Sequence, residues 1–381
     1  MGSQNKMIKE RGNVMLSIQE FISQHPNWET LLSSEPYYIT TEWDGDYFLL
    51  KYSQFESDFL NPLVRECRGS IFYKDPITHA VKCVCMPFYK FGNYGESYAD
   101  PIDWPTAKVM EKVDGSLIKV WHHNGWHVST NGKIDAYQRY NDSDFGSIVD
   151  KALNGNTKDF FEILDKNRVY MFELVSPYSR VTISYDYTAL YYLGSRDMIT
   201  MQELEYNDYP VDFAKFGIKH PKFYDLSSLE ACIEAVNHMS KDEEGFVVVD
   251  KEFHRLKVKS PEYLVSFHAN NNGVITTRRV LSLIQENKLD DFLGYCPQYT
   301  DFVNDIRLKL KLLIQKYNDI LYDYWCAFEL PRKEFAEAVK KSPYKDFLFR
   351  RYDNPNLSAK EYVLSWTLSR LTETIQNDLE V

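Results

Sequence analysis

This chain of 381 residues has no run of eighteen apolar residues, so we expect no transmembrane helix. The segment from Met1 to Val14 is polar and charged and lacks the apolar core of a secretion signal. The six cysteines are scattered, and Cys83-x-Cys85 has no second pair that would complete a zinc site. We therefore expect a cytoplasmic protein with reduced thiols.

The chain also lacks an excess of basic residues. Its net charge of −11 argues against a surface built for nonspecific nucleic-acid binding, because phosphate contacts need local cations. Residues 305–351 are a local exception, with eleven Lys or Arg against seven Asp or Glu. That local balance of +4 fits either a solvated helix face or an RNA-contacting face.

The secondary-structure signals change near residue 268. Before it, short β-branched and aromatic runs alternate with turns such as Asn124-Gly125, a pattern typical of antiparallel strands. The expected strands are 47–50, 70–73, 80–86, 117–121, 169–175, 190–193, 245–250 and 256–259, and the expected helices are 14–22 and 147–164.

After residue 268 a polar segment, 270–273, leads into helical periodicity. Between Phe302 and Leu330 apolar residues recur with the spacing of one helix face, namely at Val303, Ile306, Leu310, Leu313, Tyr317, Ile320, Tyr324 and Phe328. A second such segment runs over 359–379. We therefore expect an α+β fold, with an antiparallel-sheet domain over 1–267 and an all-α domain over 268–381.

Four short motifs indicate the chemistry. A lysine motif, Glu111 to Ser116, is followed in order by Phe172-Glu173, by Glu244-Gly245-Phe246 and by Lys257-Val258-Lys259. One Lys-x-Asp-Gly is a weak signal, because so short a pattern often arises by chance. Four blocks, each beside a strand-like apolar run, indicate a buried nucleotide site built for nucleophilic catalysis by a lysine.

A lysine attacks the α-phosphate of a nucleotide only as the neutral amine, and its ordinary pKa is near 10.4. Burial and neighbouring cations lower that pKa, since both disfavour the ammonium form. The product would be a covalent lysine–nucleotide, with pyrophosphate as the leaving group. The cations that could assist while holding phosphates are Arg68, Lys90, Lys257 and Lys259.

The acidic and glycine residues of the motifs have their own expected roles. Glu173 and Glu244 could hold a divalent metal or contact the ribose, because Mg²⁺ needs only one or two protein carboxylates beside phosphate oxygens. Asp114-Gly115 would form a tight turn that presents Lys112, with Gly115 adopting a backbone conformation closed to larger residues.

Each of these residues has an ordinary alternative. Lys112 could be a surface lysine beside a turn, and Glu244 could simply end an acidic run. Lys257 and Lys259 share one strand face, which is usually solvated. Glu173 is harder to explain in this way, because a carboxylate within the apolar strand 171–175 needs a partner.

In this order the motifs resemble the covalent nucleotidyltransferases, and within them the RNA ligase 1 family of T-even bacteriophages. The resemblance covers about residues 40–268 and implies that Lys112 is the adenylated residue. The segments that carry it are 66–69 and 87–91, whose Arg68 and Lys90 would contact ATP, then 111–117, 172–175, 177–185 with Arg180, 193–196, 244–247 and 256–260.

The chain departs from the family pattern at two positions. Asn131 stands where the family carries a lysine or arginine, so either Lys133 substitutes or one phosphate contact is weaker. Lys51 falls where an aromatic residue touches the nucleotide. The implied nucleotide-binding residues are Lys51, Arg68, Lys90, Glu111, Lys112, Asp114, Gly115, Glu173, Arg180, Glu244, Lys257 and Lys259, and the implied metal ligands are Glu173, Glu244 and Asp290. Asp290 is equally explained as a surface helix acid.

The resemblance implies an ATP-dependent RNA ligase that uses Mg²⁺, or Mn²⁺ in its place. Lys112 would take AMP from ATP, AMP would pass to an RNA 5′-phosphate, and a 3′-hydroxyl would displace it. The partner would be RNA, with a cleaved tRNA as the family's kind of substrate, and the helical domain would set that specificity. No obligate protein partner is evident, and a phage-encoded protein would act in the host cytoplasm.

Four other functions remain open. A DNA ligase or an mRNA capping guanylyltransferase shares the lysine chemistry, but these enzymes usually append a small barrel where this chain has helical periodicity. A catalytically silent RNA-end-binding protein would keep the pocket without the chemistry. A helical adaptor would use residues 268–381 to bind a partner protein.

Overall fold

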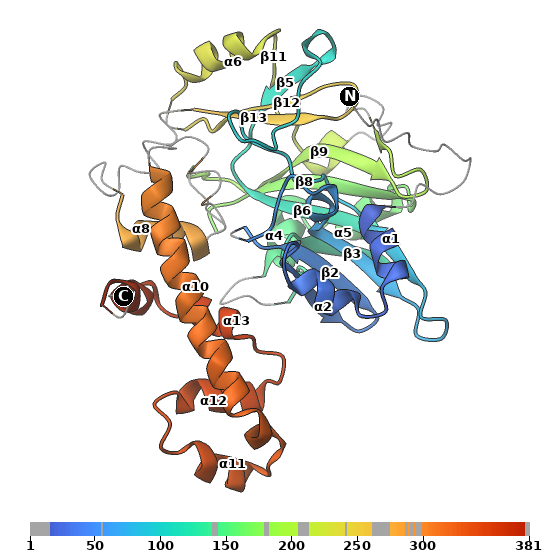
Figure 1. Ribbon diagram of the computed structural model, residues 1–381. Helices are drawn as coiled ribbons and strands as arrows, with labels where there is room; N and C mark the ends of the chain where they lie inside the picture. The colour runs from blue at the N-terminus through green and yellow to red at the C-terminus, as the bar shows by residue number, and fades with distance from the viewer. Residues whose placement is uncertain are drawn as a thin grey trace, which may run out of the picture. The chain divides into compact units, whose positions relative to one another are not determined.

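The structure is a computed structural model that describes residues 16–138 except 55, then 144–178, 183–204, 213–240, 242–260, 275–285, 289, 293 and 299–377. The chain divides into two compact units, Met1–Phe267 and His268–Val381. Three antiparallel sheets and several helices form the first unit, and helices form the second, so the expected α+β class is confirmed (Figure 1). Within the described residues, no helix combines the length and apolar character of a membrane span.

The first sheet has the strand order β1-β2-β3-β4. Its strands are β1 (Ile39–Asp44), β2 (Tyr47–Tyr52), β3 (Arg68–Lys74) and β4 (Val81–Cys85). The β2–β3 register shifts between Leu50 and Lys51, so that Lys51 lies opposite Arg68 and Gly69 has no partner residue. Gly69 has a φ of +76°, so it is the extra residue of a β-bulge.

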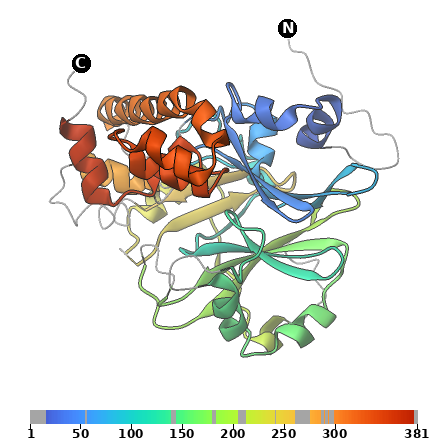
Figure 2. The ribbon, with the colours of Figure 1, turned by 90° about the horizontal axis from the view of Figure 1, so that it is seen from below.

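Three helices accompany this sheet: α1 (Ser17–Gln24), α2 (Trp28–Ser33) and α3 (Pro62–Glu66). Figures 1 and 2 both place α1 and α2 beside the blue strands. Their apolar residues, among them Ile18 and Leu32, share a core cluster with Phe48 and Phe72 of the sheet. The helices therefore bury one face of the first sheet.

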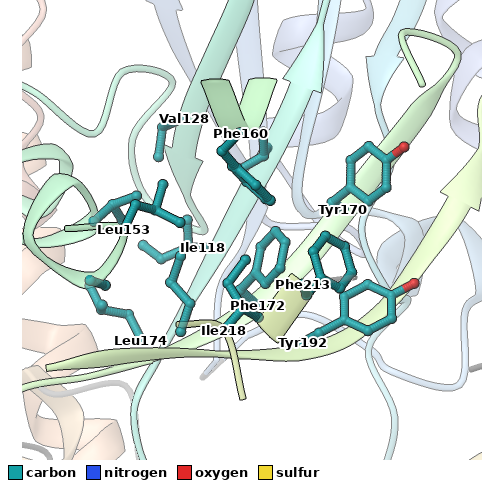
Figure 3. Close-up of a cluster of buried hydrophobic side chains, with 14 of the residues drawn as sticks. Ile118, Val128, Leu153, Phe160, Tyr170, Phe172, Leu174, Tyr192, Phe213 and Ile218 are labelled. Carbon is teal, nitrogen blue, oxygen red and sulfur yellow. The ribbon is translucent and has the colours of Figure 1, made fainter. Parts of the chain in front are cut away.

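The second sheet has the order β10-β9-β8-β6-β7. Its strands are β6 (Ser116–His122), β7 (Trp126–Thr130), β8 (Arg168–Val175), β9 (Ala189–Asp197) and β10 (Glu203–Leu204). One face packs against α4 (Phe145–Ala152), α5 (Thr157–Glu162) and the 3₁₀ turn Phe213–Phe216, in the aromatic core of Figure 3. The other face carries Trp121 and Met171, which pack on Leu49 and Ile71 of the first sheet.

The third sheet has the order β11-β5-β12-β13. Its strands are β5 (Lys108–Glu111), β11 (Phe223–Tyr224), β12 (Gly245–Val249) and β13 (Arg255–Lys259), with the 3₁₀ turn Trp104–Thr106 before β5. Helix α6 (Leu229–Val236) buries Cys232 and Val236 against Phe246 and Val248 of this sheet. The loop Lys112–Gly115 joins β5 to β6 and so crosses from the third sheet to the second.

The described helices of the second unit are α8 (Thr277–Gln285), α10 (Thr300–Asp323), α11 (Arg332–Val339), α12 (Lys345–Asp353), α13 (Ala359–Leu364) and α14 (Leu368–Asn377), with a 3₁₀ turn at Trp325–Glu329. In α10 the first six residues of the predicted stripe, from Val303 to Ile320, are all buried. The helix ends at Asp323, so the prediction that it continues to Leu330 is wrong.

All eight predicted strands are present, and the Asn124-Gly125 turn joins β6 to β7. Two predicted helices were wrong in length, because each is a pair. Residues 147–164 form α4 and α5, separated by Asn154 and Gly155 in the left-handed conformation, and 359–379 form α13 and α14. In the described part of the chain the cysteines are free thiols, at Cys67, Cys83, Cys85, Cys232 and Cys326.

Candidate active site

Lys112 lies in a charged cluster with Glu244 and Lys259, two residues from the later motifs, at one end of the third sheet. The Lys112 Nζ lies 2.7 Å from Oε2 of Glu244, and the Lys259 Nζ lies 3.1 Å from Oε1 of the same carboxylate. Glu244 and Lys259 are buried, whereas the Lys112 side chain keeps 19% of its exposure. Three motifs that are separate in the sequence therefore form one charged cluster with a partly accessible amine.

Strand pairing explains why these three residues meet. Gly245 lies opposite Lys259 in the β12–β13 pair, and the Gly245 carbonyl accepts a 2.8 Å hydrogen bond from the Lys112 N–H. Gly245 has a φ of +130°, and a Cβ there would overlap the Val258 carbonyl. Glycine thus lets β12 approach β13 closely, and this approach sets the position of Glu244.

Gly115 is needed for space rather than for its backbone conformation. Its φ is not in the left-handed region, so the conformational role predicted from the sequence is wrong. A Cβ at Gly115 would overlap the carbonyl of Leu174 and lie 3.0 Å from Cγ of Glu173. The absent side chain therefore lets the lysine loop lie directly against β8, the strand that carries Glu173.

Glu173 is the carboxylate that β8 contributes to the site. It pairs with Leu117 of β6 and lies on the side of the sheet that faces the first sheet. Burial raises the pKa of Glu173 to about 7, and nearby Glu244 adds to this rise, while Lys112 and Arg68 oppose it. The carboxyl is therefore partly protonated near neutral pH, close to the lysine cluster.

Lys257 and Arg68 form a second pair of cations. Lys257 is buried, with its Nζ 5.1 Å from the centre of the Phe91 ring, and the Arg68 guanidinium lies 5.7 Å from the same ring. Since Lys257 and Lys259 are both buried, the alternative of a solvated strand face is wrong. The side of β13 that carries these lysines faces away from the apolar cluster made by Leu256 and Val258.

Three buried polar atoms near the β3 bulge have no hydrogen-bond partner among the described residues. They are Nη1 of Arg68, Oγ of Ser70 and Oδ1 of Asn131. Asn131 lies beside the bulge, because a Cβ on Gly69 would lie 2.8 Å from the Asn131 Cα. The Lys51 Nζ is close as well, 3.8 Å from where a Cβ on Gly132 would be. A ligand with both donors and acceptors would satisfy this group.

Three other predicted site residues have protein partners. The Lys90 ammonium lies among aromatic rings, 4.7 Å from the Phe59 centroid. A carboxylate oxygen of Glu111 accepts a hydrogen bond from the Lys222 N–H, and one of Asp114 accepts a 2.6 Å bond from the Ile183 N–H. Asp114 thereby ties the lysine loop to the segment that follows β8. Nucleotide contacts by these three residues stay predictions.

The metal ligands predicted from the sequence, Glu173, Glu244 and Asp290, stay predictions. In the part of the chain that the structure describes, no three His, Cys, Asp or Glu residues are grouped so as to hold a metal. Each oxygen of Glu244 already lies within ion-pair distance of a lysine. Arg180 and Asp290 lie outside the described residues, so their roles stay predictions.

Comparison with known proteins places this site in a family. A profile described as RNA ligase matches residues 66–263, which is more than half of the chain and includes all four motifs. The chain belongs to the RNA ligase family. The expectation of an RNA ligase 1-like family, drawn from the order of the motifs, is thereby confirmed.

Two viral relatives extend this similarity. A protein of Autographa californica nuclear polyhedrosis virus, provisionally named bifunctional polynucleotide kinase/RNA ligase, is 30% identical over 364 residues. The alignment covers 88% of this chain and 49% of the relative, so the chain spans about half the length of that protein. An RNA ligase of Rhodothermus phage RM378 is 24% identical, with 86% of this chain and 85% of the relative covered.

Solved structures of ligases are also similar. An archaeal ATP-dependent RNA ligase matches with a TM-score of 0.45 and 14% identity over 77% of this chain and 79% of its own. A Naegleria gruberi RNA ligase, solved as a mutant with ATP and Mn, matches with a TM-score of 0.33 and 17% identity over 42% of this chain and 50% of its own.

Two further residues, one at a departure from the family pattern and one in a segment that carries the resemblance, have ion-pair partners within the protein. The Lys133 ammonium pairs with Glu42 on the surface, which gives it a partner other than a phosphate. Arg196, in the segment 193–196, is buried and pairs with Glu203 at 2.7 Å, while Glu203 also binds Arg255. Arg196 therefore belongs to an internal ion pair.

Sequence reasoning missed Lys119, which is completely buried in β6 between Ile118 and Val120. Its Nζ donates a hydrogen bond to the carbonyl of Gly69, the bulge residue beside Arg68. The signal was available in the sequence, because Lys119 interrupts an apolar strand as Glu173 does. Lys119 and Glu173 each lie within an apolar strand, so the expectation that a buried charge needs a partner applies to both.

Proposed function

We propose that this chain is an ATP-dependent RNA ligase in which Lys112 carries AMP as a covalent intermediate. The observation that supports this most directly is the cluster of Lys112, Glu244 and Lys259 beside Glu173, because it joins a partly accessible amine to buried charges. The amine can reach a ligand from solvent, while the surrounding charges stay fixed by the sheets.

The cations around the cluster suit a nucleoside triphosphate. The unpartnered Nη1 of Arg68 is a guanidinium donor, and guanidinium groups bind phosphate oxygens strongly. Lys257 and Lys259 lie on the same side of β13 and would bind along the same phosphate chain. Glu173, which is partly protonated near neutral pH, would accept or donate a hydrogen bond at the ribose.

The first step forms a bond between Nζ of Lys112 and the α-phosphorus, while the bond from phosphorus to pyrophosphate breaks. The amine must lose a proton, and the Glu244 carboxylate lies 2.7 Å away as its acceptor. An RNA 5′-phosphate then displaces the lysine and takes AMP. Finally a 3′-hydroxyl attacks that 5′-phosphorus, AMP leaves, and the phosphodiester bond is formed.

Divalent metal would arrive with the nucleotide as Mg²⁺·ATP, or with Mn²⁺ in place of Mg²⁺. It would neutralise charge on the phosphates and so help the α-phosphorus accept electrons from the amine. The carboxylate of the site best able to join it is Glu173, since both oxygens of Glu244 are held by lysines.

The decisive experiment is intact mass spectrometry after incubation with ATP and Mg²⁺. Wild type should gain one AMP, about 329 Da for one covalent adduct, and Lys112→Ala should gain none. Pyrophosphate treatment beforehand removes any AMP bound during expression. GTP in place of ATP distinguishes a capping enzyme, and no adduct with either nucleotide would leave the silent RNA-end-binding protein as the better function.

The substrate should then be tested directly. The adenylated protein should join an RNA with a 5′-phosphate to one with a 3′-hydroxyl, and a matched DNA strand tests for DNA ligase activity. We propose that residues 268–381 contact the RNA. Lys311 and Lys316 are exposed on α10, so Lys311→Glu with Lys316→Glu should weaken RNA binding and its salt dependence but leave the AMP adduct unchanged.

If that double variant binds RNA as wild type does, the basic balance of this region is a solvated helix face. If these helices bind another protein and the double variant binds RNA as wild type does, the helical adaptor becomes the favoured function of this region. An equal charge change elsewhere on the surface, Lys158→Glu with Lys166→Glu, is the control for loss of overall positive charge.

A further inference from the structure

Lys119 is an unusual residue for the interior of this protein. Its neighbours in β6, Ile118 and Val120, point into the aromatic core of Figure 3. Lys119 points to the opposite side of the sheet. Trp121 lies on that same side and packs against the first sheet. None of the Lys119 surface is exposed. The amine is therefore enclosed between two sheets, where an apolar side chain would ordinarily lie.

Among the described residues the ammonium group has no acidic partner. Its hydrogen bond goes to the Gly69 carbonyl, and the charged or titratable groups that face it are Arg68, Cys83 and Cys85. The pKa of Lys119 is lowered to about 8, mainly because the side chain is buried; Arg68 contributes to the lowering, and the two cysteines oppose it. A methionine would fill similar space without the cost of desolvation, so the amine has some use other than packing.

The Gly69 carbonyl is a place where such a donor is needed. A β-bulge leaves its extra residue outside the regular hydrogen-bond ladder. Gly69 is that residue, it has no partner on β2, and its φ is +76°. Lys119 donates to this carbonyl from the facing sheet and so fixes the chain directly after Arg68.

Arg68 is the residue whose position this bond affects. Its backbone pairs with Lys51 before the bulge, and its Nη1 is buried without a partner among the described residues. Its guanidinium also lowers the pKa of Glu173, so it lies close to the active-site carboxylate. A shift of the bulge would therefore move an unpaired guanidinium at the edge of the site.

We propose that Lys119 is a positioning residue for the nucleotide: it holds the Gly69 bulge from the facing sheet so that Arg68 presents its guanidinium to the phosphates. This inference rests on the proposed adenylation of Lys112. Lys119 itself is enclosed and does not touch the substrate. It acts through the position of Arg68. Its own positive charge, close to that guanidinium, would also attract the phosphates electrostatically.

The test measures AMP-adduct formation against ATP concentration in the full-length protein. Lys119→Met should raise the ATP concentration for half-maximal rate about tenfold, the usual effect of losing one hydrogen bond from a charged donor. The maximal rate should change much less, because Lys112 and Glu244 are untouched. Lys158→Met, at an exposed position of α5, is the matched control and should behave as wild type.

A double-mutant cycle separates this role from a structural one. If Lys119 acts through Arg68, Lys119→Met should have little further effect on ATP dependence when Arg68→Ala is already present. Lys119→Arg, which keeps a charged donor, should recover part of the affinity. Because Lys119→Met removes a buried charge that has no acidic partner, its melting temperature should equal or exceed that of wild type.

Two results would overturn the inference. In the first, Lys119→Met needs the same ATP concentration as wild type for half-maximal adduct formation. In the second, the double variant raises this concentration by the product of the increases caused by Lys119→Met and Arg68→Ala alone. If the methionine variant does not fold, Lys119→Gln, which is neutral but still donates an N–H, takes its place in the cycle. Absence of any adduct in wild type would instead reject the proposed function, so the two failures are distinguishable.

Discussion

The two units of this protein differ in whether their charged side chains are buried. In the described part of Met1–Phe267 ten charged side chains are buried, namely Glu66, Lys90, Asp114, Lys119, Arg196, Glu244, Asp250, Arg255, Lys257 and Lys259. In the described part of His268–Val381 no charged side chain is buried, and Ser342 is the one buried polar residue. The charged residues of that unit lie in exposed pairs such as Lys309–Asp305.

This difference indicates where chemistry requires fixed charge. A helical unit built on apolar stripes is stabilised by packing, and its exposed ion pairs contribute little. A buried charge is costly unless it is paired, and Glu244, Arg196 and Arg255 each have a partner supplied by another strand. The same pairing that lowers this cost also holds Lys112, Glu244 and Lys259 in fixed positions.

The largest effect is expected when a buried partner is removed. Glu244→Gln leaves Lys112 and Lys259 without their shared carboxylate and should cost about 3–5 kcal/mol of unfolding free energy. Urea unfolding measures this, and the AMP adduct should be lost as well. Asp242→Asn, at an exposed position two residues earlier, is the control. Equal stability of the two variants would mean that the buried pairing contributes no more than a surface charge.

In the helical unit the largest effect should come from an apolar residue. Ile306→Ala removes a buried side chain from the α10 stripe and should cost about 2–5 kcal/mol. Adenylation by the folded protein should stay at the wild-type rate, because Lys112, Glu244 and Lys259 belong to the other unit. Leu312→Ala, on the exposed side of α10, is the matched control in thermal melting. If Ile306→Ala lost adenylation at a temperature where both units are folded, the expectation that adenylation depends only on the sheet unit would be wrong.

Glu173 should make stability depend on pH in a defined direction. Burial raises its pKa to about 7, against 4.5 for a carboxyl in the unfolded chain. Between these values the folded state binds a proton that the unfolded state lacks, so this contribution to stability is lost as pH rises from about 4.5 to about 7. Glu173→Gln should therefore gain stability over wild type at pH 8 and not at pH 4.

The measurement is urea unfolding at both pH values, with the exposed Glu162→Gln as the control. If wild type and Glu173→Gln keep the same difference at pH 4 and pH 8, the carboxyl does not titrate in this range.

The smallest effect is expected from an exposed ion pair. The Lys309 Nζ lies 3.0 Å from Oδ2 of Asp305 one helical turn away. Asp305→Asn should cost about 0.5 kcal/mol, because solvent screens the pair, and added salt should remove the difference. Chemical unfolding at low and high salt measures this. A cost near that of Glu244→Gln would remove the contrast between the two units.

The sequence by itself determined the eight main strands, the α10 stripe as far as Ile320, and the identity of Lys112, Glu173, Glu244, Lys257 and Lys259 as candidate residues. Local patterns carry these signals: β-branched runs, a helical repeat, and charged residues within apolar strands. Helix ends were predicted less well, because turns at Asn154-Gly155 and after Asp323 depend on backbone conformations that periodicity does not record.

Only the tertiary structure decided which charges meet. Glu244 binds two lysines because β5, β12 and β13 lie side by side, whereas Arg196 binds Glu203 and Lys133 binds Glu42. Gly115 is required by the closeness of β8, and Lys119 reaches Gly69 from another sheet. Such contacts join residues far apart in the chain. Their geometry follows from sheet packing, which no single stretch of sequence contains.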